Sequence, residues 1–196
     1  GTLSAHLTFQ ATGRPRRPAV FVAPEMPMRL TALFALLLCL ALPAAGADLS
    51  KLKAWDGGAT PKLVPKDLDG KPRNLADYRG KVVVLNFWAT WCAPCVKEMP
   101  ALARLSEKLP ADRFALLTVN FGESEKRVQA FLKEQGLRLP VLLDRRMDAS
   151  KPWVDRGLPT TYVIDADGAI RYRVLGELEW DAPAVEARIR SLLPKG

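Results

Sequence analysis

Apolar residues along the middle of the chain alternate between continuous runs and helical spacing. Residues 81–88 (KVVVLNFW) and 114–120 (FALLTVN) are apolar runs, which are typical of strands buried on both faces of a sheet. The segments that follow, at about 93–109 and 125–135, carry apolar side chains at the three- and four-residue spacing of an amphipathic helix. A short apolar run at 141–143 predicts a third strand. The pattern therefore predicts strands and helices in alternation.

Both ends of this region are predicted to contain hairpins, each built around an Asp-Gly pair. Residues 63–75 are expected to form two short extended pieces around Asp69-Gly70. Residues 161–165 and 170–175 are expected to form two strands joined through Asp167-Gly168. These hairpins add antiparallel strands to the alternating pattern, so the predicted sheet is mixed.

A last helix is expected to follow the second hairpin, with Asp181 as its N-cap. Its apolar face begins at Val185 and continues four, seven and eight positions later with Ile189, Leu192 and Leu193. Together these elements predict one α/β domain over residues 61–196, a mixed sheet with helices on both faces. The Gly-rich residues 48–60 show little periodicity and are expected to be a linker.

The first 47 residues differ in character from the rest. Met28-Arg29 precedes an uncharged run of 18 residues, which ends in the small-x-small pattern of a signal cleavage site, Ala45-Gly46-Ala47. Residues 28–47 are therefore expected to be a signal peptide. A membrane anchor is the alternative, because the run approaches the length of about 17–25 residues that spans a bilayer. Residues 1–27 are expected to be an upstream extension outside the fold.

Composition and charge narrow the class of protein. Apolar residues make up 48% of the chain and charged residues 26%, a globular balance that excludes a fully disordered, collagen-like or coiled-coil protein. The net charge is +8, but acidic residues are scattered among the basic ones, and no basic run is interleaved with aromatic residues. A nucleic-acid partner is therefore not expected.

Cysteine and histidine are rare in this chain, which limits its chemistry. There are three cysteines and one histidine, and His6 and Cys39 both lie in the first 47 residues. The predicted domain holds only Cys92 and Cys95. This excludes a Ser-His-Asp or Cys-His catalytic arrangement, and also a self-contained structural zinc site, which needs four Cys or His ligands. No metal and no cofactor are expected, and one close pair of thiols remains.

This pair lies where the predicted central strand ends and a helix begins, within Trp91-Cys92-Ala93-Pro94-Cys95. The free N–H groups at a helix N-terminus stabilise an anion, so Cys92 is expected to have a lowered pKa and to attack as a thiolate. Cys95, one turn further on, can then close on the resulting mixed disulfide. A proline is tolerated near the start of a helix. The spacing therefore indicates a redox-active dithiol.

Two separate motifs resemble a known family. Residues 86–95 (NFWATWCAPC) look like the active-site segment of thioredoxin-fold proteins. Their continuation at 96–100 (VKEMP) resembles the TlpA/ResA branch, which consists of bacterial envelope thiol–disulfide oxidoreductases. Residues 157–165 (GLPTTYVID) fit the second signature of that branch, in which the proline, here Pro159, is cis and faces the disulfide.

The resemblance covers about residues 60–193 and implies a thioredoxin-like fold with an N-terminal hairpin. The helix and strand at 124–144 match an insertion typical of the branch. The implied catalytic residues are Cys92, Cys95, Glu98 and Pro159. The implied active-site neighbours are Asn86, Trp91, Ala93, Pro94 and Leu158.

Glu98 is the candidate for assisting the second thiol. Thioredoxin itself has a buried acid where this chain has Asn86, so deprotonation of Cys95 must be assisted by another group. Glu98 lies one helical turn after Cys95. If buried there, its charge would oppose a nearby thiolate, while its basicity would let it accept the Cys95 proton. The alternative is a solvated acid favoured by the helix dipole. Trp88 is expected in the core and Trp91 exposed at the site.

The resemblance implies an exported enzyme that reduces disulfides of other proteins in the periplasm or cell envelope, for example in cytochrome c or copper-site assembly. It implies no cofactor, but it requires a membrane protein as electron donor. Contact with the membrane itself is expected only through an uncleaved anchor. Two alternatives stay open: an oxidant that installs disulfides, since the motif does not fix the direction of electron flow, and a metallochaperone that binds Cu(I) through both thiolates. Titration of the reduced protein with Cu(I) separates the last alternative from the others.

Overall fold

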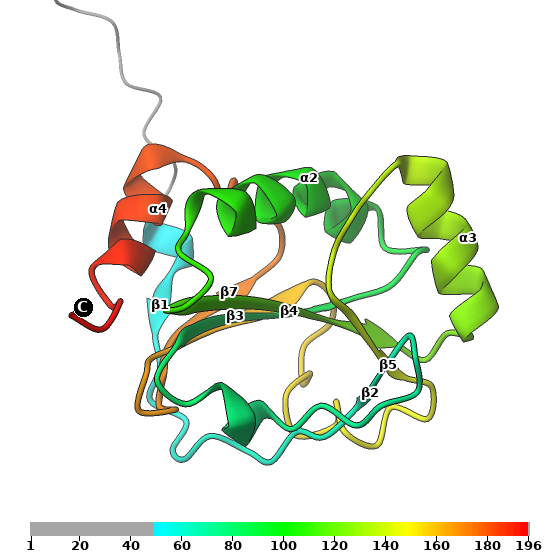
Figure 1. Cartoon of the computed structure of the whole chain (residues 1–196), viewed down its shortest axis with the longest axis horizontal. Helices are drawn as coiled ribbons and strands as arrows, with labels where there is room; N and C mark the ends of the chain where they lie inside the picture. Colours follow the sequence, from blue (N-terminus) through cyan, green and yellow to red (C-terminus); the bar gives the residue numbers. More distant parts are fainter. Residues whose placement is uncertain (1–48, 196) are drawn as a thin grey trace, which may run out of the picture. The chain divides into compact units, whose positions relative to one another are not determined.

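Seven strands form one mixed sheet in the computed structural model, which describes residues 49–195 (Figure 1). In chain order they are β1 (Lys53–Ala54), β2 (Lys66–Asp67), β3 (Val82–Trp88), β4 (Phe114–Phe121), β5 (Val141–Asp144), β6 (Thr160–Ile164) and β7 (Ile170–Leu175). Across the sheet the order is β1-β7-β6-β3-β4-β5-β2. β4 runs parallel to β3 and β5, and all other neighbours are antiparallel. This is the α/β class with the mixed sheet that the sequence predicts.

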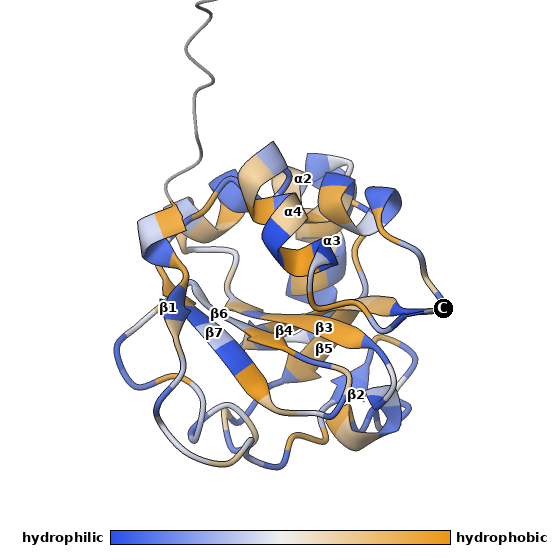
Figure 2. Cartoon of the chain, turned by 90° about the vertical axis from the view of Figure 1, so that its left-hand side faces the viewer, coloured by the Kyte–Doolittle hydropathy of each residue, from blue (hydrophilic) through white to orange (hydrophobic). Residues whose placement is uncertain are grey.

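Residues 49–195 also form three α-helices and two short 3-10 helices. They are η1 (Leu49–Lys51), η2 (Leu75–Tyr78), α2 (Ala93–Lys108), α3 (Glu125–Gln135) and α4 (Pro183–Arg190). Figures 1 and 2 show the three α-helices on one side of the sheet, whereas η2 and irregular segments lie against the other side. The second face of the sheet is therefore covered by a 3-10 helix and loops in place of α-helices.

The central strands separate two layers of core. β3 is buried along its whole length, as its apolar run predicts. Val82 and Val84 pack into the layer beneath α2 and α4, and Val83 and Leu85 pack into the layer on the opposite face. A third cluster, at the end of β3, packs Trp88 with both cysteines and with residues of α3. The cysteine pair is thus part of the core.

Part of the expected linker belongs to the sheet, which corrects the prediction for residues 48–60. β1 pairs with β7 at the sheet edge, and the Trp55 N–H donates to the Arg171 carbonyl at 3.0 Å. Edge pairing uses backbone groups, so a search for periodic side chains does not detect it. The N-terminal hairpin is present in a short form: β2 is bridged to Pro72, and its turn is closed by backbone N–H groups that donate to the Asp67 carboxylate.

The last helix begins and ends differently from the prediction. The N-cap of α4 is Ala182, whereas the Asp181 carboxylate accepts a hydrogen bond from Arg104 of α2 at 2.6 Å. An ion pair with a neighbouring helix has therefore replaced the expected cap. Because α4 ends at Arg190, Leu192 and Leu193 follow the helix, although both still pack against the core.

The segments that were singled out near the N-terminus lie outside the described residues. This holds for the upstream extension 1–27 and for the signal peptide or anchor 28–47, including His6 and Cys39. Within residues 49–195, no helix is both long enough and apolar enough to cross a membrane.

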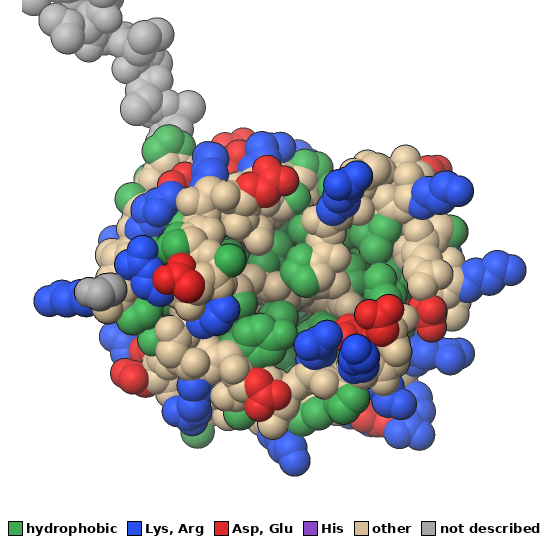
Figure 3. Space-filling model, viewed as in Figure 1, with side chains coloured by type: hydrophobic (Ala, Val, Ile, Leu, Met, Phe, Trp, Pro, Cys, Tyr) green, Lys and Arg blue, Asp and Glu red, His purple; other side chains and the backbone are tan. Residues whose placement is uncertain are grey.

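Charges of both signs share the surface of the described domain. On the face shown in Figure 3, Lys and Arg side chains are interspersed with Asp and Glu side chains around a hydrophobic area. Several of them form exposed ion pairs, such as Lys97 with Glu177 at 2.5 Å and Arg146 with Asp148 at 3.1 Å. Exposed pairs of this kind contribute at most about 1 kcal/mol each, so the apolar layers carry the stability of the fold.

Leu105→Ala is expected to lower the free energy of unfolding by about 2–5 kcal/mol, because it leaves a cavity between α2 and the sheet. Leu105 is completely buried in the layer that α2 shares with α4. Leu175→Ala is the matched control: Leu175 is 41% exposed, and its loss is expected to cost less than about 1 kcal/mol. Urea unfolding of both variants measures the difference. Equal losses would contradict this assignment of the core.

Candidate active site

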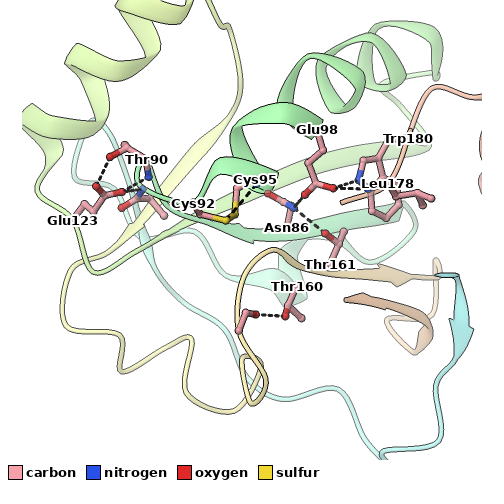
Figure 4. Close-up of a disulfide and its surroundings, with 12 residues drawn as sticks. Asn86, Thr90, Cys92, Cys95, Glu98, Glu123, Thr160, Thr161, Leu178 and Trp180 are labelled. Atoms are coloured by element: carbon pink, nitrogen blue, oxygen red, sulfur yellow. Dashed lines mark hydrogen bonds between the residues drawn. A yellow bond between two sulfur atoms is a disulfide. The ribbon is translucent and has the colours of Figure 1, made fainter. Parts of the chain in front are cut away.

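The cysteine pair forms a disulfide at the point where β3 gives way to α2 (Figure 4). Cys92 is the N-cap of α2, and Cys95 lies in the first turn. The Cys95 backbone N–H points at the Cys92 sulfur, at a nitrogen–sulfur distance of 3.3 Å. In the reduced protein this N–H faces the atom that would carry a thiolate charge, and the N-terminus of a helix stabilises such a charge.

Both cysteines are buried, whereas the residue before them and the two residues between them are exposed. Cys92 is 5% exposed and Cys95 is fully buried, whereas Trp91 is 67% exposed. Ala93 and Pro94 are exposed as well. The three exposed residues flank Cys92 in the sequence and form an apolar rim beside it. The prediction that Trp91 is exposed and Trp88 is in the core is confirmed.

Glu98 lies in the core, 3% exposed, on the face of α2 that covers the sheet. Its carboxylate accepts hydrogen bonds from Asn86 Nδ2 at 2.8 Å, from the Leu178 N–H at 3.1 Å and from Trp180 Nε1 at 2.9 Å. Burial raises the pKa of Glu98 to about 7, although the three hydrogen bonds act in the opposite direction. A solvated position for Glu98, the alternative in the sequence-based interpretation, is excluded.

Asn86 connects Glu98 to the strand that follows the proline. It is completely buried on β3, and its Nδ2 donates to Glu98 Oε1 and to the Thr161 hydroxyl, each at 2.8 Å. Figure 4 shows Asn86 between the disulfide and Glu98. An amide at this position provides hydrogen bonds without a second buried charge.

The Leu158–Pro159 peptide bond is cis, as the resemblance implies. Leu158 packs against the cluster that contains both cysteines, and the Pro159 carbonyl accepts a hydrogen bond from the Gly176 N–H at 2.9 Å. The structure therefore brings the second sequence motif to the same site as the cysteines.

Sequence reasoning missed three residues of the site. Trp180 and Leu178 hold the Glu98 carboxylate from the segment before α4. Glu123, after β4, accepts hydrogen bonds from the backbone N–H and the hydroxyl of Thr90 at 2.7 and 2.6 Å, which fixes the chain next to the active-site motif. All three contacts join residues more than thirty positions apart. No local pattern signals them, and a single aromatic residue such as Trp180 is more often a packing residue than part of a partner groove.

Within residues 49–195, no cluster of at least three His, Cys, Asp or Glu residues could hold a metal ion.

Comparison with known proteins gives the family. Residues 57–173 match the model of the AhpC/TSA family. The chain belongs to the AhpC/TSA family of thioredoxin-like proteins. The thiol–disulfide oxidoreductase ResA of Geobacillus thermodenitrificans (strain NG80-2) is 38% identical over 122 residues, which cover 62% of this chain and 70% of that protein.

Solved structures agree with this assignment. A thiol:disulfide interchange protein of the thioredoxin family from Chlorobium tepidum TLS is 28% identical with a TM-score of 0.56, covering 69% of this chain and 99% of that one. The exposed lipoprotein thioredoxin of Streptococcus pneumoniae strain TIGR4 is 30% identical with a TM-score of 0.57, covering 67% of this chain and all of that one. This family member is thus a thioredoxin-like thiol–disulfide oxidoreductase, and its structure joins Cys92 and Cys95 in a disulfide.

Proposed function

We propose that the protein is exported and reduces disulfides of other proteins in the periplasm or cell envelope. The observation that carries this proposal is the position of Cys92 at the N-cap of α2, with the buried Cys95 and Glu98 behind it. Export is supported by the signal-like pattern of residues 28–47. It is also supported by the similarity to a protein described as an exposed lipoprotein thioredoxin.

The reaction begins with the Cys92 thiolate. It attacks one sulfur of the substrate disulfide, forms a mixed disulfide and expels the other substrate sulfur as a thiolate. Cys95 then gives its proton to a base, and its thiolate attacks the Cys92 sulfur. The substrate leaves with both thiols reduced, and the enzyme retains the Cys92–Cys95 disulfide. No cofactor takes part, and two electrons pass from the enzyme to the substrate.

Glu98 is the base that we assign to the second step. With a pKa of about 7 it is partly ionised at neutral pH, so it can both accept and release a proton. Asn86 cannot take this role, because an amide does not accept a proton in this range. The assignment gives one buried carboxylate two opposing effects: its charge disfavours a thiolate nearby, and its basicity helps to form one.

We expect substrates to bind along the rim beside the disulfide. The exposed Trp91 would contribute apolar contact area. We expect the backbone at Leu158, next to Pro159, to pair with an extended segment of the partner, because Leu158 packs against the cluster that contains both cysteines. Recognition through the backbone does not depend on side-chain identity, which suits an enzyme with several substrates. Envelope proteins involved in cytochrome c or copper-site assembly are the substrates to test first.

A membrane protein would return the enzyme to its reduced state. The disulfide form cannot attack another disulfide, so each turnover requires two electrons from a donor. In an exported protein these electrons come from the cytoplasm across the membrane. An uncleaved anchor at residues 28–47 would keep the domain near such a donor.

The reduction potential is expected to lie below about −200 mV, well under the value of about −120 mV of a strong oxidant. The reason is that the dithiol lies in a thioredoxin-like environment, where we expect the disulfide form to be stable relative to the reduced form. Equilibration of the full chain with glutathione buffers, followed by thiol alkylation and mass measurement, gives the value. A potential near −120 mV would reverse the proposed direction and favour a role in disulfide formation.

A further inference from the structure

The two oxygens of the Glu98 carboxylate have different surroundings. Oε2 accepts two hydrogen bonds, from the Leu178 N–H at 3.1 Å and from Trp180 Nε1 at 2.9 Å. Oε1 accepts one, from Asn86 Nδ2 at 2.8 Å. A carboxylate oxygen has two lone pairs, so Oε2 has none left, whereas Oε1 retains one. A proton that arrives at Glu98 therefore binds to Oε1, the oxygen that faces Asn86.

Both donors to Oε2 come from the segment between β7 and α4, far from Glu98 in the sequence. Trp180 is completely buried and packs with residues of α2 and α4, so its indole ring is held in place. In Figure 4 the Trp180 and Leu178 donors lie on the side of Glu98 away from the disulfide, and Asn86 lies on the side toward it. The segment before α4 thus determines which oxygen faces the sulfurs.

One further charge acts on Glu98 from the same segment. Glu177 disfavours the ionised form of Glu98 by Coulomb repulsion. Glu177 itself forms an ion pair with Lys97 of α2 at 2.5 Å. Hydrogen bonds to a charged acceptor are stronger than those between neutral groups. The Trp180 N–H is therefore well suited to keep this buried carboxylate available as an anion.

We propose that Trp180 is a positioning residue for thiol–disulfide exchange: its indole N–H holds Oε2, so that Oε1 is the oxygen that takes the Cys95 proton. The inference rests on the proposed function, in which Glu98 is the base. The Cys95 S–H bond breaks and an O–H bond forms at Oε1. The Cys95 thiolate then bonds to the Cys92 sulfur, and the bond between Cys92 and the substrate sulfur breaks, releasing the substrate as a thiolate.

Trp180→Phe tests this role, because it removes the N–H and keeps an aromatic ring. The rate at which the substrate is released from the mixed disulfide is measured against pH, in single turnovers with a model disulfide. The pH midpoint of this rate is expected to rise by about one pH unit, since the ionised form of Glu98 loses a charge-assisted hydrogen bond. The matched control is Trp153→Phe. Trp153 is 1% exposed in the core layer on the opposite face, and its indole nitrogen has no hydrogen-bond partner among the described residues. This control should keep the wild-type midpoint.

Nuclear magnetic resonance of the oxidised full chain gives a second test that needs no variant of Trp180. The indole N–H resonance of Trp180 is expected to titrate with a midpoint near pH 7, following Glu98, and to lose this titration in Glu98→Gln. The Trp153 resonance should not respond in this range. The same spectra show whether Trp180→Phe is folded.

The outcomes separate this inference from the proposed function. A folded Trp180→Phe variant with the wild-type midpoint would overturn the inference and leave the proposed function intact. A Trp180 resonance that does not shift with pH would do the same. Loss of stability in both tryptophan variants with unchanged midpoints would leave Trp180 with a purely structural role and would also overturn it. If the wild-type chain reduces no disulfide at any pH, the proposed function fails, and the positioning role fails with it.

Discussion

Replacing Cys95 with serine is expected to turn the enzyme into a trap for its substrates. Cys92, the less buried of the two residues, can still attack a disulfide, but no second thiol is present to release the mixed disulfide. Turnover is expected to fall by about three orders of magnitude or more, the scale observed when one member of a catalytic unit is removed. The measurement is turnover with a model disulfide, together with mass spectrometry of the covalent adducts that form in cells.

Two variants serve as controls for the trap. Cys92→Ser leaves the buried Cys95 as the only sulfur of the pair and is expected to form few adducts. The double serine variant should form none. If Cys92→Ser accumulates as many partners as Cys95→Ser, the assignment of Cys92 as the attacking sulfur is wrong. The identities of the trapped proteins also test whether the substrates belong to cytochrome c or copper-site assembly.

Glu98 is expected to make the stability of the protein depend on pH between about 4.5 and 7. Burial raises its pKa from 4.5 in the unfolded chain to about 7 in the fold. In this interval the folded state binds more protons than the unfolded state, so the contribution of Glu98 to stability is fully present below pH 4.5 and is lost as the pH rises through 7. The shift corresponds to roughly 3 kcal/mol. Chemical denaturation at a series of pH values measures it.

Glu98→Gln is the matched variant, because the amide has nearly the same shape and cannot titrate. Its stability is expected to stay nearly constant between pH 4.5 and 7. The effect of Glu98 on stability can be distinguished from that of the acids Asp67 and Asp181. Arginine side chains and backbone N–H groups donate hydrogen bonds to these two carboxylates and lower their pKa values. The stabilisation that they provide is therefore lost only at lower pH. A wild-type profile as flat as that of the variant would contradict the raised pKa.

The same substitution is expected to affect the two thiols in opposite directions. Without the carboxylate charge, Cys92 should be alkylated at a lower pH than in the wild type. Without the base, release of the mixed disulfide should be slower, by about 10²-fold or more, the usual contribution of a general base. Alkylation rate against pH and single-turnover reduction of a model disulfide measure the two effects. If neither changes, Glu98 is structural only.

The sequence by itself determined the elements whose signals are local. The continuous run at β3 and the helical period of α2 identified the strand and the helix on either side of Cys92, and both lie where they were predicted. The spacing of Cys92 and Cys95 identified the chemistry, because a strand end followed by a helix start places both thiols on one turn. Motifs around Glu98 and Pro159 identified the family.

Only the tertiary structure decided what surrounds these residues. Glu98 could have been a solvated acid from its position in α2. It is a buried acid because Trp180 and Leu178, about eighty positions away, close over it. Thr90 and Glu123 form a similar contact across the end of the sheet. Periodicity and spacing report the neighbours of a residue along the chain, whereas burial and hydrogen bonding depend on segments that meet only when the sheet has formed, and these contacts set the proton affinity of the site.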